Sequence, residues 1–242
     1  SASGGKSPVS KVGVTPEALF EAGAHFGHQI KRWNPKMAKY LWGKQSGIHI
    51  FDLEKTAKQI DEACEALTAL ASEGKRIVLV GSKRQAKEFV LATARELNLP
   101  FVTERWLGGT ITNWKQVKTR IDKLADLKKK KEAGELKKYT KKEQILFDRE
   151  IARLEKFLGG LSTLSSPPEV LVVVDTQKER AAVREASSRG LTIVAIVDSN
   201  SNPDPINYVI PMNDDSTKAI ELVVKALGKA IGLGKAKQKA DI

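Results

Sequence analysis

Residues 170–179 read VLVVVDTQKE, so that five consecutive apolar residues precede a short polar segment. A continuous apolar run of this length is typical of a strand buried on both faces of a parallel sheet. The segment from Thr176 to Glu179 has the form of a capping box, in which the first and fourth residues of a helix start bond each other's backbone. We therefore predict a strand that leads directly into a helix.

Two other segments share this pattern. Residues 76–85, RIVLVGSKRQ, combine an apolar run with a second capping-box sequence from Ser82 to Gln85, and residues 192–197, TIVAIV, form a third apolar run. Strands that alternate with helices indicate a parallel sheet covered by helices on both faces. The chain is therefore expected to have an α/β fold.

Cap residues, prolines and short β-branched runs predict the elements around this sheet. They are a helix over residues 16–22 after Thr15, a loop rich in His, Trp, Asn and Pro, two short strands around Gly43 and Gly47, a helix capped by Asp52 that continues to residue 72, and a final helix over residues 216–231. The single cysteine, Cys64, excludes an internal disulfide and is expected to be buried in the second of these helices.

The segment between Trp114 and Leu158 breaks the α/β pattern. Its apolar residues recur at spacings of three and four, which predicts two helices that pack along a heptad-like seam. Gly134 interrupts the first helix, and a third capping box, Thr140 to Glu143, starts the second. We predict an antiparallel coiled-coil hairpin inserted into the α/β domain, with two helices of about 20 residues, each about 30 Å long.

The segment ERWLGGTITNW, residues 104–114, leads into this hairpin. Its glycine pair and a second pair, Gly159-Gly160, bracket the insertion, which gives both chain crossings backbone freedom. The two tryptophans are expected to pin the base of the hairpin to the α/β body. The predicted organisation is a flexible basic arm (1–14), an α/β body (15–110 and 160–232), an inserted hairpin (111–159) and a basic tail (233–242).

The charge of the chain points to a polyanionic partner. The net charge is +12, and residues 105–156 hold sixteen Lys or Arg against eight Asp or Glu, which places +8 in and beside the hairpin. Nucleic acid is the first expectation for such a protein, ahead of an anionic membrane. With no secretory signal and no apolar run long enough for a membrane span, a soluble intracellular protein is expected.

Two basic groups are candidates for RNA contact. The hairpin lysines suit a phosphate backbone, although lysines on a helical pair can also be a simple solvated face. The loop HQIKRWNPKMAKY, residues 28–40, interleaves cations with aromatic rings that can stack on bases, although Trp33 can equally anchor the loop to the core. The residues predicted to bind RNA are His25, His28, Lys31, Arg32, Trp33, Asn34, Lys36, Lys83, Arg84, Arg105, Trp106, Asn113, Trp114, Lys115, Lys118, Lys128, Lys129, Lys130, Lys131, Lys137, Lys138, Lys141 and Lys142.

Metal and nucleotide sites are weaker alternatives. Glu21, His25 and His28 would share one face of a continuous helix, but two glycines weaken that helix. Asp198 and Asp204, with Asp214 and Asp215, follow a predicted strand and could hold Mg²⁺, or could simply form turns. The turns at Ser82 and Thr176 lie where α/β proteins bind nucleotides, but neither has a glycine-rich phosphate motif. No cofactor is expected, apart from this possible Mg²⁺.

The chain resembles the family of small-subunit ribosomal protein two in its bacterial or organellar form. The segments that carry the resemblance run in order from about residue 17 to 216 and are EAGAHFGHQIKRWNPKMAKYLWG, GIHIFDLEKT, ERWLGGTITNW, TKKE, LEKFLGG, PPEVLVVVDTQKERAAVREA and AIVDSNSNPDPINYVIPMNDD. Pro205, Met212 and the short segment after Gly234 depart from the usual pattern.

The resemblance implies a Rossmann-like (flavodoxin-like) body with a protruding coiled-coil hairpin. It also implies a non-catalytic role: binding small-subunit ribosomal RNA between head and body, and helping to dock neighbouring proteins, including small-subunit protein one. The expected location is the cytoplasmic ribosome, with an organellar ribosome left open and no membrane partner. The competing hypotheses are a nucleotide-dependent enzyme that uses the α/β body, and a scaffold whose coiled coil pairs with another protein.

Overall fold

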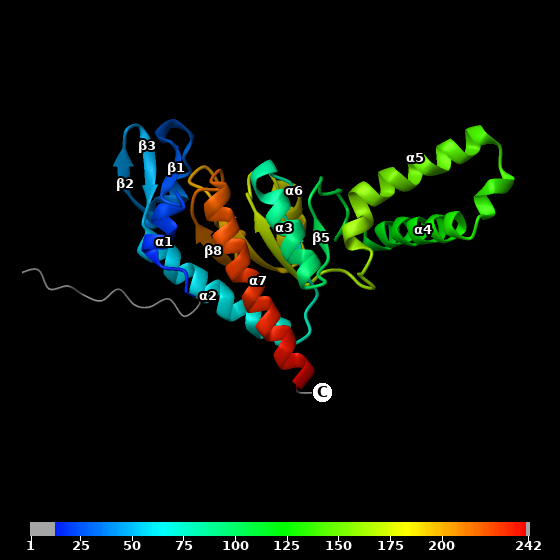
Figure 1. The fold of residues 1–242 in the computed structure, drawn as a ribbon. Coiled ribbons are helices and arrows are strands. Elements are labelled where there is room, and N and C mark those ends of the chain that lie inside the picture. The colour runs from blue at the N-terminus through cyan, green and yellow to red at the C-terminus, as the bar shows by residue number, and fades with distance from the viewer. Residues whose placement is uncertain (1–12, 241–242) are drawn as a thin grey trace, which may run out of the picture.

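The computed structural model describes residues 13–240 (Figure 1). The predicted flexible arm, residues 1–14, therefore lies outside the described residues except at its end, where Val14 is buried in the core. None of the helices in the described part of the chain is long and apolar enough to cross a membrane.

The body is built on a five-stranded parallel sheet. Its strands are β4 (Ile77–Val80), β5 (Phe101–Val102), β6 (Val170–Val174), β7 (Thr192–Val197) and β8 (Tyr208–Pro211), and their spatial order is β5-β4-β6-β7-β8. Numbered by their order within this sheet, the strands run 2-1-3-4-5, the flavodoxin-like arrangement. The predicted α/β fold class is confirmed.

Helices cover both faces of this sheet. Ile77 and Leu79 of β4 pack into one apolar cluster, with α2 (Leu53–Ser72), α3 (Arg84–Glu96) and α7 (Thr217–Ala240). Val78 and Val80, which alternate with them along the strand, point to the opposite face. There they pack with α6 (Arg180–Ser188) and the base of the hairpin. Alternate side chains of a strand point to opposite faces, so each apolar strand supplies both clusters.

The helices α2 and α7 lie side by side and form the longest packed pair of the body. A Cβ at Gly234 would lie 2.4 Å from the carbonyl oxygen of Thr68, so only glycine allows this approach. The helix continues to Ala240, beyond the predicted end at residue 231, because its last turns lie against α2. The predicted basic tail is therefore helical from 233 to 240. Cys64 of α2 is buried as expected, and burial raises the pKa of its thiol to about 12.

A small antiparallel sheet lies at one end of the body. It consists of β1 (Phe26–Gln29), β3 (Ile48–Phe51) and β2 (Leu41–Gln45) in that order, and α1 (Pro16–Glu21) precedes it. Thr15 caps α1 and Asp52 caps α2, both as predicted. Strand β1 was expected to be part of a loop, because its short FGHQ sequence has no apolar run. The rest of the expected loop contains two short 3-10 helices, Ile30–Arg32 and Pro35–Tyr40.

Two of the three predicted capping boxes are wrong. Helix α3 begins after Lys83 and α6 after Glu179, and neither of these cap side chains bonds the helix start. Ser82 and Glu179 instead bond each other: Glu179 Oε1 accepts the backbone N–H of Ser82 at 2.9 Å and the Ser82 hydroxyl. The two polar segments follow adjacent strands, β4 and β6, so their side chains meet each other rather than their own helices.

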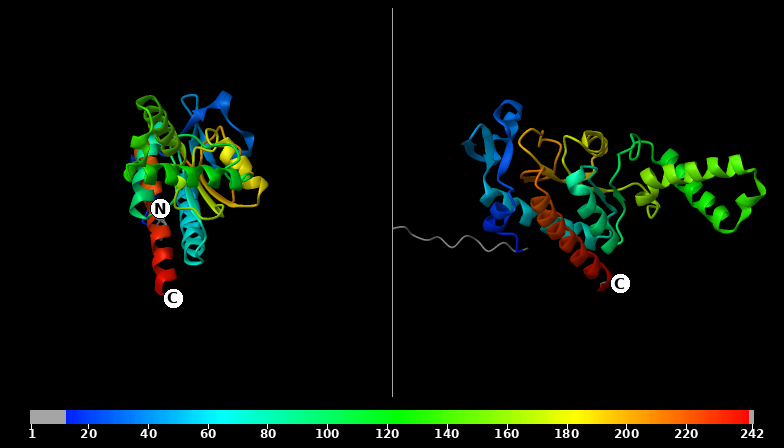
Figure 2. Two further views of the ribbon diagram at one scale, coloured as in Figure 1. Left: turned by 90° about the vertical axis from the view of Figure 1, so that its right-hand side faces the viewer. Right: turned by 45° about the horizontal axis from the view of Figure 1, so that its top comes forward.

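The hairpin consists of α4 (Trp114–Glu132) and α5 (Lys141–Leu158), and it projects from the end of the body opposite the small sheet (Figures 1 and 2). Gly134 has a φ of +74° at the turn. The capping box of Thr140 and Glu143 is confirmed. The predicted apolar residues line one cluster with the body, and the coiled-coil geometry of the pair stays a prediction.

Candidate nucleic-acid interface

The residues predicted to bind RNA lie in three separate places. The loop after β1 lies at one end of the molecule, the hairpin at the other, and the turn after β4 between them (Figure 1). The sequence alone does not reveal this separation. Each region is therefore a distinct candidate surface.

The segment ERWLGGTITNW folds around one carboxylate, that of Glu185 on α6. Its oxygens accept the backbone N–H groups of Gly109 at 2.6 Å and Ile111 at 3.0 Å, and the indole N–H of Trp106 at 3.3 Å. Burial opposes the charge, but these hydrogen bonds outweigh burial and lower the pKa of Glu185. Glu185 therefore holds the loop that leads into the hairpin as an anion.

The two tryptophans of this segment, on either side of the glycine pair, both pack against the body. Trp106 is only 5% exposed and packs in the core, so the geometry favours its predicted anchoring role over its predicted RNA contact. Trp114 packs partly against the same cluster. A Cβ at Gly160, on the return crossing, would lie 2.3 Å from the carbonyl oxygen of Phe101. Arg105 and Asn113 are exposed beside this junction.

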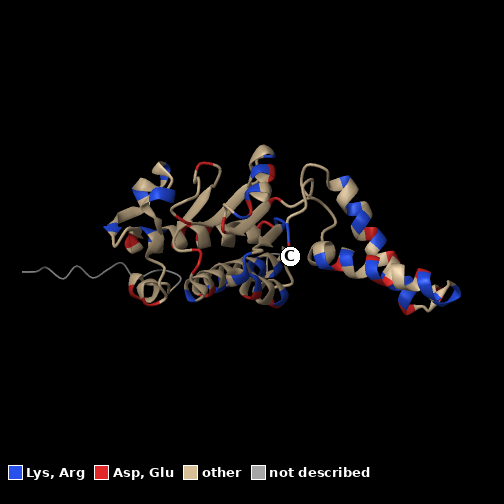
Figure 3. Cartoon of the chain, turned by 90° about the horizontal axis from the view of Figure 1, so that it is seen from above, with Lys and Arg blue, Asp and Glu red and all other residues tan. Residues whose placement is uncertain are grey.

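Basic residues occur along both helices of the hairpin as far as its tip (Figure 3). Several of them are held in ion pairs: Lys123 with Glu150 at 2.7 Å, Lys131 with Asp148 at 2.8 Å, and Lys128 with Glu155 all link α4 to α5. Two more pairs lie within α4, Lys118–Asp122 at 2.8 Å and Lys130–Asp126 at 2.7 Å. Three of the four consecutive lysines at 128–131 therefore neutralise the hairpin's own acids.

A second set of hairpin cations has no acidic partner among residues 13–240. It includes Lys137 and Lys138 in the short 3-10 helix Glu135–Lys138, and Lys141 and Lys142 at the start of α5. Lys115 and Lys129 of α4 are likewise exposed without an acid. Four of these six lysines, those at 137, 138, 141 and 142, lie where the two helices meet at the tip.

The loop after β1 is more closely tied to the body than the sequence indicated. Trp33 stacks on His49 with ring centroids 4.7 Å apart, which favours its anchoring role. Asn34 caps the following 3-10 helix and its backbone N–H donates to Ser199, while Lys36 pairs with Asp204. Lys31 and Arg32 are exposed and have no acidic partner within the described residues.

His25 and His28, predicted to act together, face different surroundings. His28 Nδ1 lies 3.0 Å from Asp198, and that hydrogen bond raises the pKa of His28. His25 stacks on Phe20 with centroids 4.3 Å apart, and burial lowers its pKa. Glu21 ends α1 and His28 lies in β1, so the helical metal site suggested by their spacing does not exist.

Lys83 lies in a cluster of carboxylates at the carboxyl ends of the parallel strands. Its ammonium is 2.5 Å from Asp214, 2.6 Å from Asp215 and 3.2 Å from Asp175, and its side chain is only 12% exposed. Burial would lower the pKa of Lys83, but the bound carboxylates outweigh burial and raise it. Lys83 is therefore turned inward and not free for a phosphate, whereas Arg84 beside it is exposed.

The same cluster bears on metal binding. The predicted pair Asp198 and Asp204 is separated, because Asp198 is buried against His28 and Asp204 is bound by Lys36. Ligand atoms of His28, Asp198 and Asp214 lie within 4.8 Å of one another, the one such group among residues 13–240. Burial and the charge of Asp198 raise the pKa of Asp214 to about 7, although Lys83 opposes this shift. Of these three residues, Asp214 is the one that the ammonium of Lys83 contacts.

The position where flavodoxin-like proteins bind phosphates is filled by the chain itself. The strand order reverses between β4 and β6, and the buried carboxylate of Glu179 accepts the backbone N–H of Ser82 at this point. A phosphate would have to displace this carboxylate or lie against its negative charge. The geometry does not favour the nucleotide-enzyme hypothesis.

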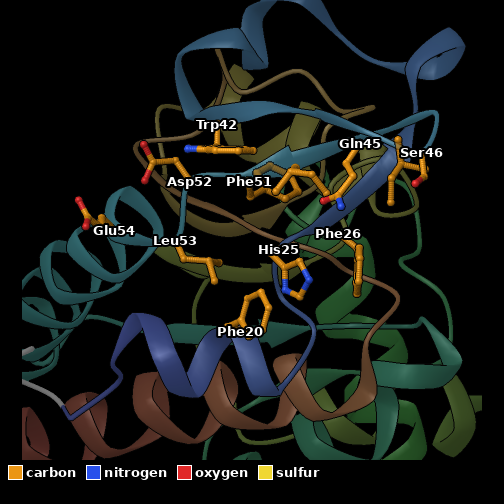
Figure 4. Close-up of a pocket in the computed structure, with 12 residues that line it drawn as sticks. Phe20, His25, Phe26, Trp42, Gln45, Ser46, Phe51, Asp52, Leu53 and Glu54 are labelled. Carbon is orange, nitrogen blue, oxygen red and sulfur yellow. The ribbon is translucent and has the colours of Figure 1, made fainter.

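An apolar pocket beside the small sheet was not predicted. It has a volume of about 720 Å³, and Phe20, Phe26, Trp42 and His25 line it (Figure 4). Trp42 is 75% exposed, although it is the largest apolar side chain on its strand. Exposed aromatic rings that border one pocket are typical of protein-binding surfaces.

Comparison with known proteins assigns the family. The family model described as ribosomal protein S2 matches residues 19–234, most of the chain. The chain belongs to the ribosomal protein S2 family. It is 45% identical, over 228 residues, to the small ribosomal subunit protein uS2 of Amoebophilus asiaticus (strain 5a2); the match covers 94% of this chain and 73% of that relative.

As a member of the S2 family, the chain is a structural protein of the small ribosomal subunit, a ribonucleoprotein that takes part in translation. Its partners are accordingly those of a ribosomal component, RNA and other ribosomal proteins. The predicted resemblance is confirmed over most of the chain. The structure distinguishes the cations that are free to contact such partners from those that are already held in ion pairs.

Proposed function

We propose that this S2-family protein binds small-subunit ribosomal RNA through the hairpin tip and the loop after β1, and helps to dock neighbouring ribosomal proteins, small-subunit protein one among them. It acts in the cytoplasmic ribosome and has no enzymatic activity. The observation that carries the proposal is the set of exposed tip lysines that lack acidic partners within residues 13–240.

Electrostatics support RNA binding by the tip. A lysine in an ion pair must lose its partner before it contacts a phosphate, whereas an unpaired lysine only releases the phosphate's counterions. Lys137, Lys138, Lys141 and Lys142 meet this condition, and Glu135 is the one acid among residues 135–142. The hairpin holds this charge away from the body, where it can reach RNA (Figure 3).

The apolar pocket supports the docking of a protein. The pocket lining also includes Asp52 and Glu54, whose charges oppose RNA phosphates, whereas an apolar protein side chain can pack against Phe20, Phe26 and Trp42. The small sheet that borders the pocket and the hairpin tip lie at opposite ends of the molecule (Figure 1), so one protein can contact RNA and a neighbouring protein at once. Trp42→Ser is expected to leave rRNA affinity unchanged while small subunits carrying it contain less small-subunit protein one, measured by quantitative mass spectrometry.

The test of RNA binding compares two quadruple variants of the full chain. One replaces Lys137, Lys138, Lys141 and Lys142 with Gln, and its matched control replaces the ion-paired Lys118, Lys123, Lys130 and Lys131 with Gln. The tip variant should bind in vitro transcribed small-subunit rRNA more weakly, with a slope of log affinity against log salt that is smaller by about 3.

The control variant carries the same change in net charge and should keep most of the salt slope. Sedimentation in a lysate gradient, with and without ribonuclease, then checks that the wild-type protein migrates with the small subunit and depends on RNA to do so. Equal losses of rRNA affinity in both variants would mean that net charge alone determines binding. Unchanged rRNA affinity in the tip variant would show that the tip is not part of the interface.

A further inference from the structure

The outer face of α5 has an unusual composition. Lys142, Ile145, Leu146, Arg149, Ala152, Arg153 and Lys156 are all exposed. At 3.6 residues per turn, these seven positions fall within about one third of the helix circumference. They form one continuous stripe along the side that faces away from α4, which we call the outer stripe.

Every acid of α5 is used elsewhere. Glu143 bonds Thr140 in the capping box, and Asp148, Glu150 and Glu155 pair with lysines of α4. These acids lie on the flanks of α5, between the buried seam and the outer stripe. The stripe itself therefore contains only cations and aliphatic residues. Among residues 13–240, Arg149 and Arg153 have no acidic partner, whereas Lys156 at the end of the stripe lies 4.0 Å from Glu104.

Helix α4 has no comparable face. Its exposed residues include Asp122, Asp126 and Glu132 among the lysines, and two of these acids pair with lysines of the same helix. A solvated helix surface normally mixes both signs of charge in this way. The segregation on α5 is thus a property of one helix rather than of the whole hairpin.

Two large aliphatic side chains lie among these cations. Ile145 is 52% exposed and Leu146 is 54% exposed, beside Lys142 and Arg149 on the same stripe. Solubility does not require exposed isoleucine and leucine, so the pair points to a surface that is covered when the protein is bound.

We propose that the outer stripe of α5 is an RNA-binding surface in which Arg149 and Arg153 hold phosphates of ribosomal RNA. This inference rests on the proposed function and extends the RNA contact from the tip along the hairpin. The partner is RNA rather than an acidic protein, because the chain belongs to a ribosomal protein family and the charge of the stripe is uniformly positive.

The stripe is long enough for several phosphates. From Lys142 to Arg153 the helix rises by about 17 Å, so the cations without an acidic partner in the described chain face successive groups of a backbone and not a single anion. An arginine presents a planar fork of donors that matches a phosphate in two bonds. Ile145 and Leu146 lie where riboses and base faces of the same strand would cover them.

The first experiment measures affinity for in vitro transcribed small-subunit rRNA as a function of salt. Arg149→Gln combined with Arg153→Gln should weaken binding about fivefold or more and reduce the salt slope by about 1.5 to 2. The matched control is Lys118→Gln with Lys130→Gln, which removes the same charge from ion-paired positions on α4 and should change affinity by less than about twofold.

The outcomes separate the two proposals. If the wild-type protein binds the rRNA and the Arg149 and Arg153 variant binds it with the same affinity and salt slope, the outer stripe is not an RNA-binding surface. The proposed function would then remain intact. Failure of the wild-type protein itself to bind the rRNA would instead overturn the proposed function.

A second experiment identifies what covers the stripe in the assembled particle. A photo-crosslinking residue at Ala152, in the middle of the stripe, should link to rRNA in small subunits, and the same residue at the exposed Ala125 of α4 should link to it less. Cross-links from Ala152 to a protein alone would overturn the assignment to RNA and make the stripe a protein-docking face.

Discussion

Ion pairs occur in two regions of this molecule and do different things in each. In the body, one lysine, Lys83, lies among three carboxylates and is almost withdrawn from solvent. In the hairpin, each lysine of a pair such as Lys123–Glu150 meets a single acid and about half of its side chain remains exposed. The chemical groups are the same, and burial sets the difference.

Burial determines what happens when one partner is lost. A buried charge without its partner keeps the cost of desolvation, whereas an exposed charge regains water. The body cluster therefore fixes the carboxyl ends of the strands in one arrangement. The hairpin pairs orient two helices and leave the other cations of the hairpin available for RNA.

The largest expected effect is that of removing the buried ammonium. Lys83→Met should lower the free energy of unfolding by about 3–5 kcal/mol, because Asp214, Asp175 and Asp215 would be left together without a cation. Urea denaturation of the purified protein measures this change.

The matched control for this substitution is Lys123→Met, which removes an ammonium from the hairpin and should cost less than about 1 kcal/mol. Lys83→Arg keeps the charge and should recover part of the loss. Equal costs for the two methionine variants would refute the distinction between the two regions.

The second effect concerns the junction between these regions, where Glu185 is intermediate in burial. Glu185→Gln should destabilise the protein by about 2–3 kcal/mol, because a neutral amide accepts the N–H groups of Gly109 and Ile111 less strongly and places its own donors against them. The free energy of unfolding is again measured in urea.

The pH dependence of this effect has a definite sign. The folded-state pKa of Glu185 lies below its ordinary value of 4.5, so its stabilisation is present above pH 4.5 and is lost as the pH falls through the lowered pKa. The difference in stability between wild type and variant should thus be constant above about pH 5.5 and shrink in more acid solution. A difference that stays constant down to pH 3 would contradict an ionised Glu185 in this role.

Much of the fold could be predicted from the sequence because its signals are local. Apolar runs marked β4, β6 and β7, and Thr140 with Glu143 marked the start of α5, since both members of that capping box lie within four residues. The same motif failed at Ser82 because its true partner, Glu179, is distant in the chain. A pattern within one segment does not indicate a bond that forms only after two strands come together.

The candidate site was less predictable for the same reason. The count of lysines predicted a basic hairpin, but it could not show that Lys128 and Lys131 face acids of α5 while Arg149 and Arg153 do not. Lys83 has the sequence context of a phosphate ligand and is instead enclosed by three carboxylates from two turns, those after β6 and β8. Partner choice among charged side chains depends on the register of packed elements, which composition does not contain.

The smallest expected effect tests the hairpin side of the comparison directly. Lys131 and Asp148 join the two helices at 2.8 Å, and both side chains are 54% exposed. A double-mutant cycle with Lys131→Ala and Asp148→Ala should give a coupling energy of about 0.2–0.5 kcal/mol, which falls toward zero in 0.5 M salt because exposed charges are screened. Unfolding in urea at low and high salt provides the four free energies. A coupling above about 1.5 kcal/mol that resists salt would mean that this pair is as constrained as the buried cluster, and the lysines of the hairpin could no longer be divided into orienting and RNA-binding groups by their exposure.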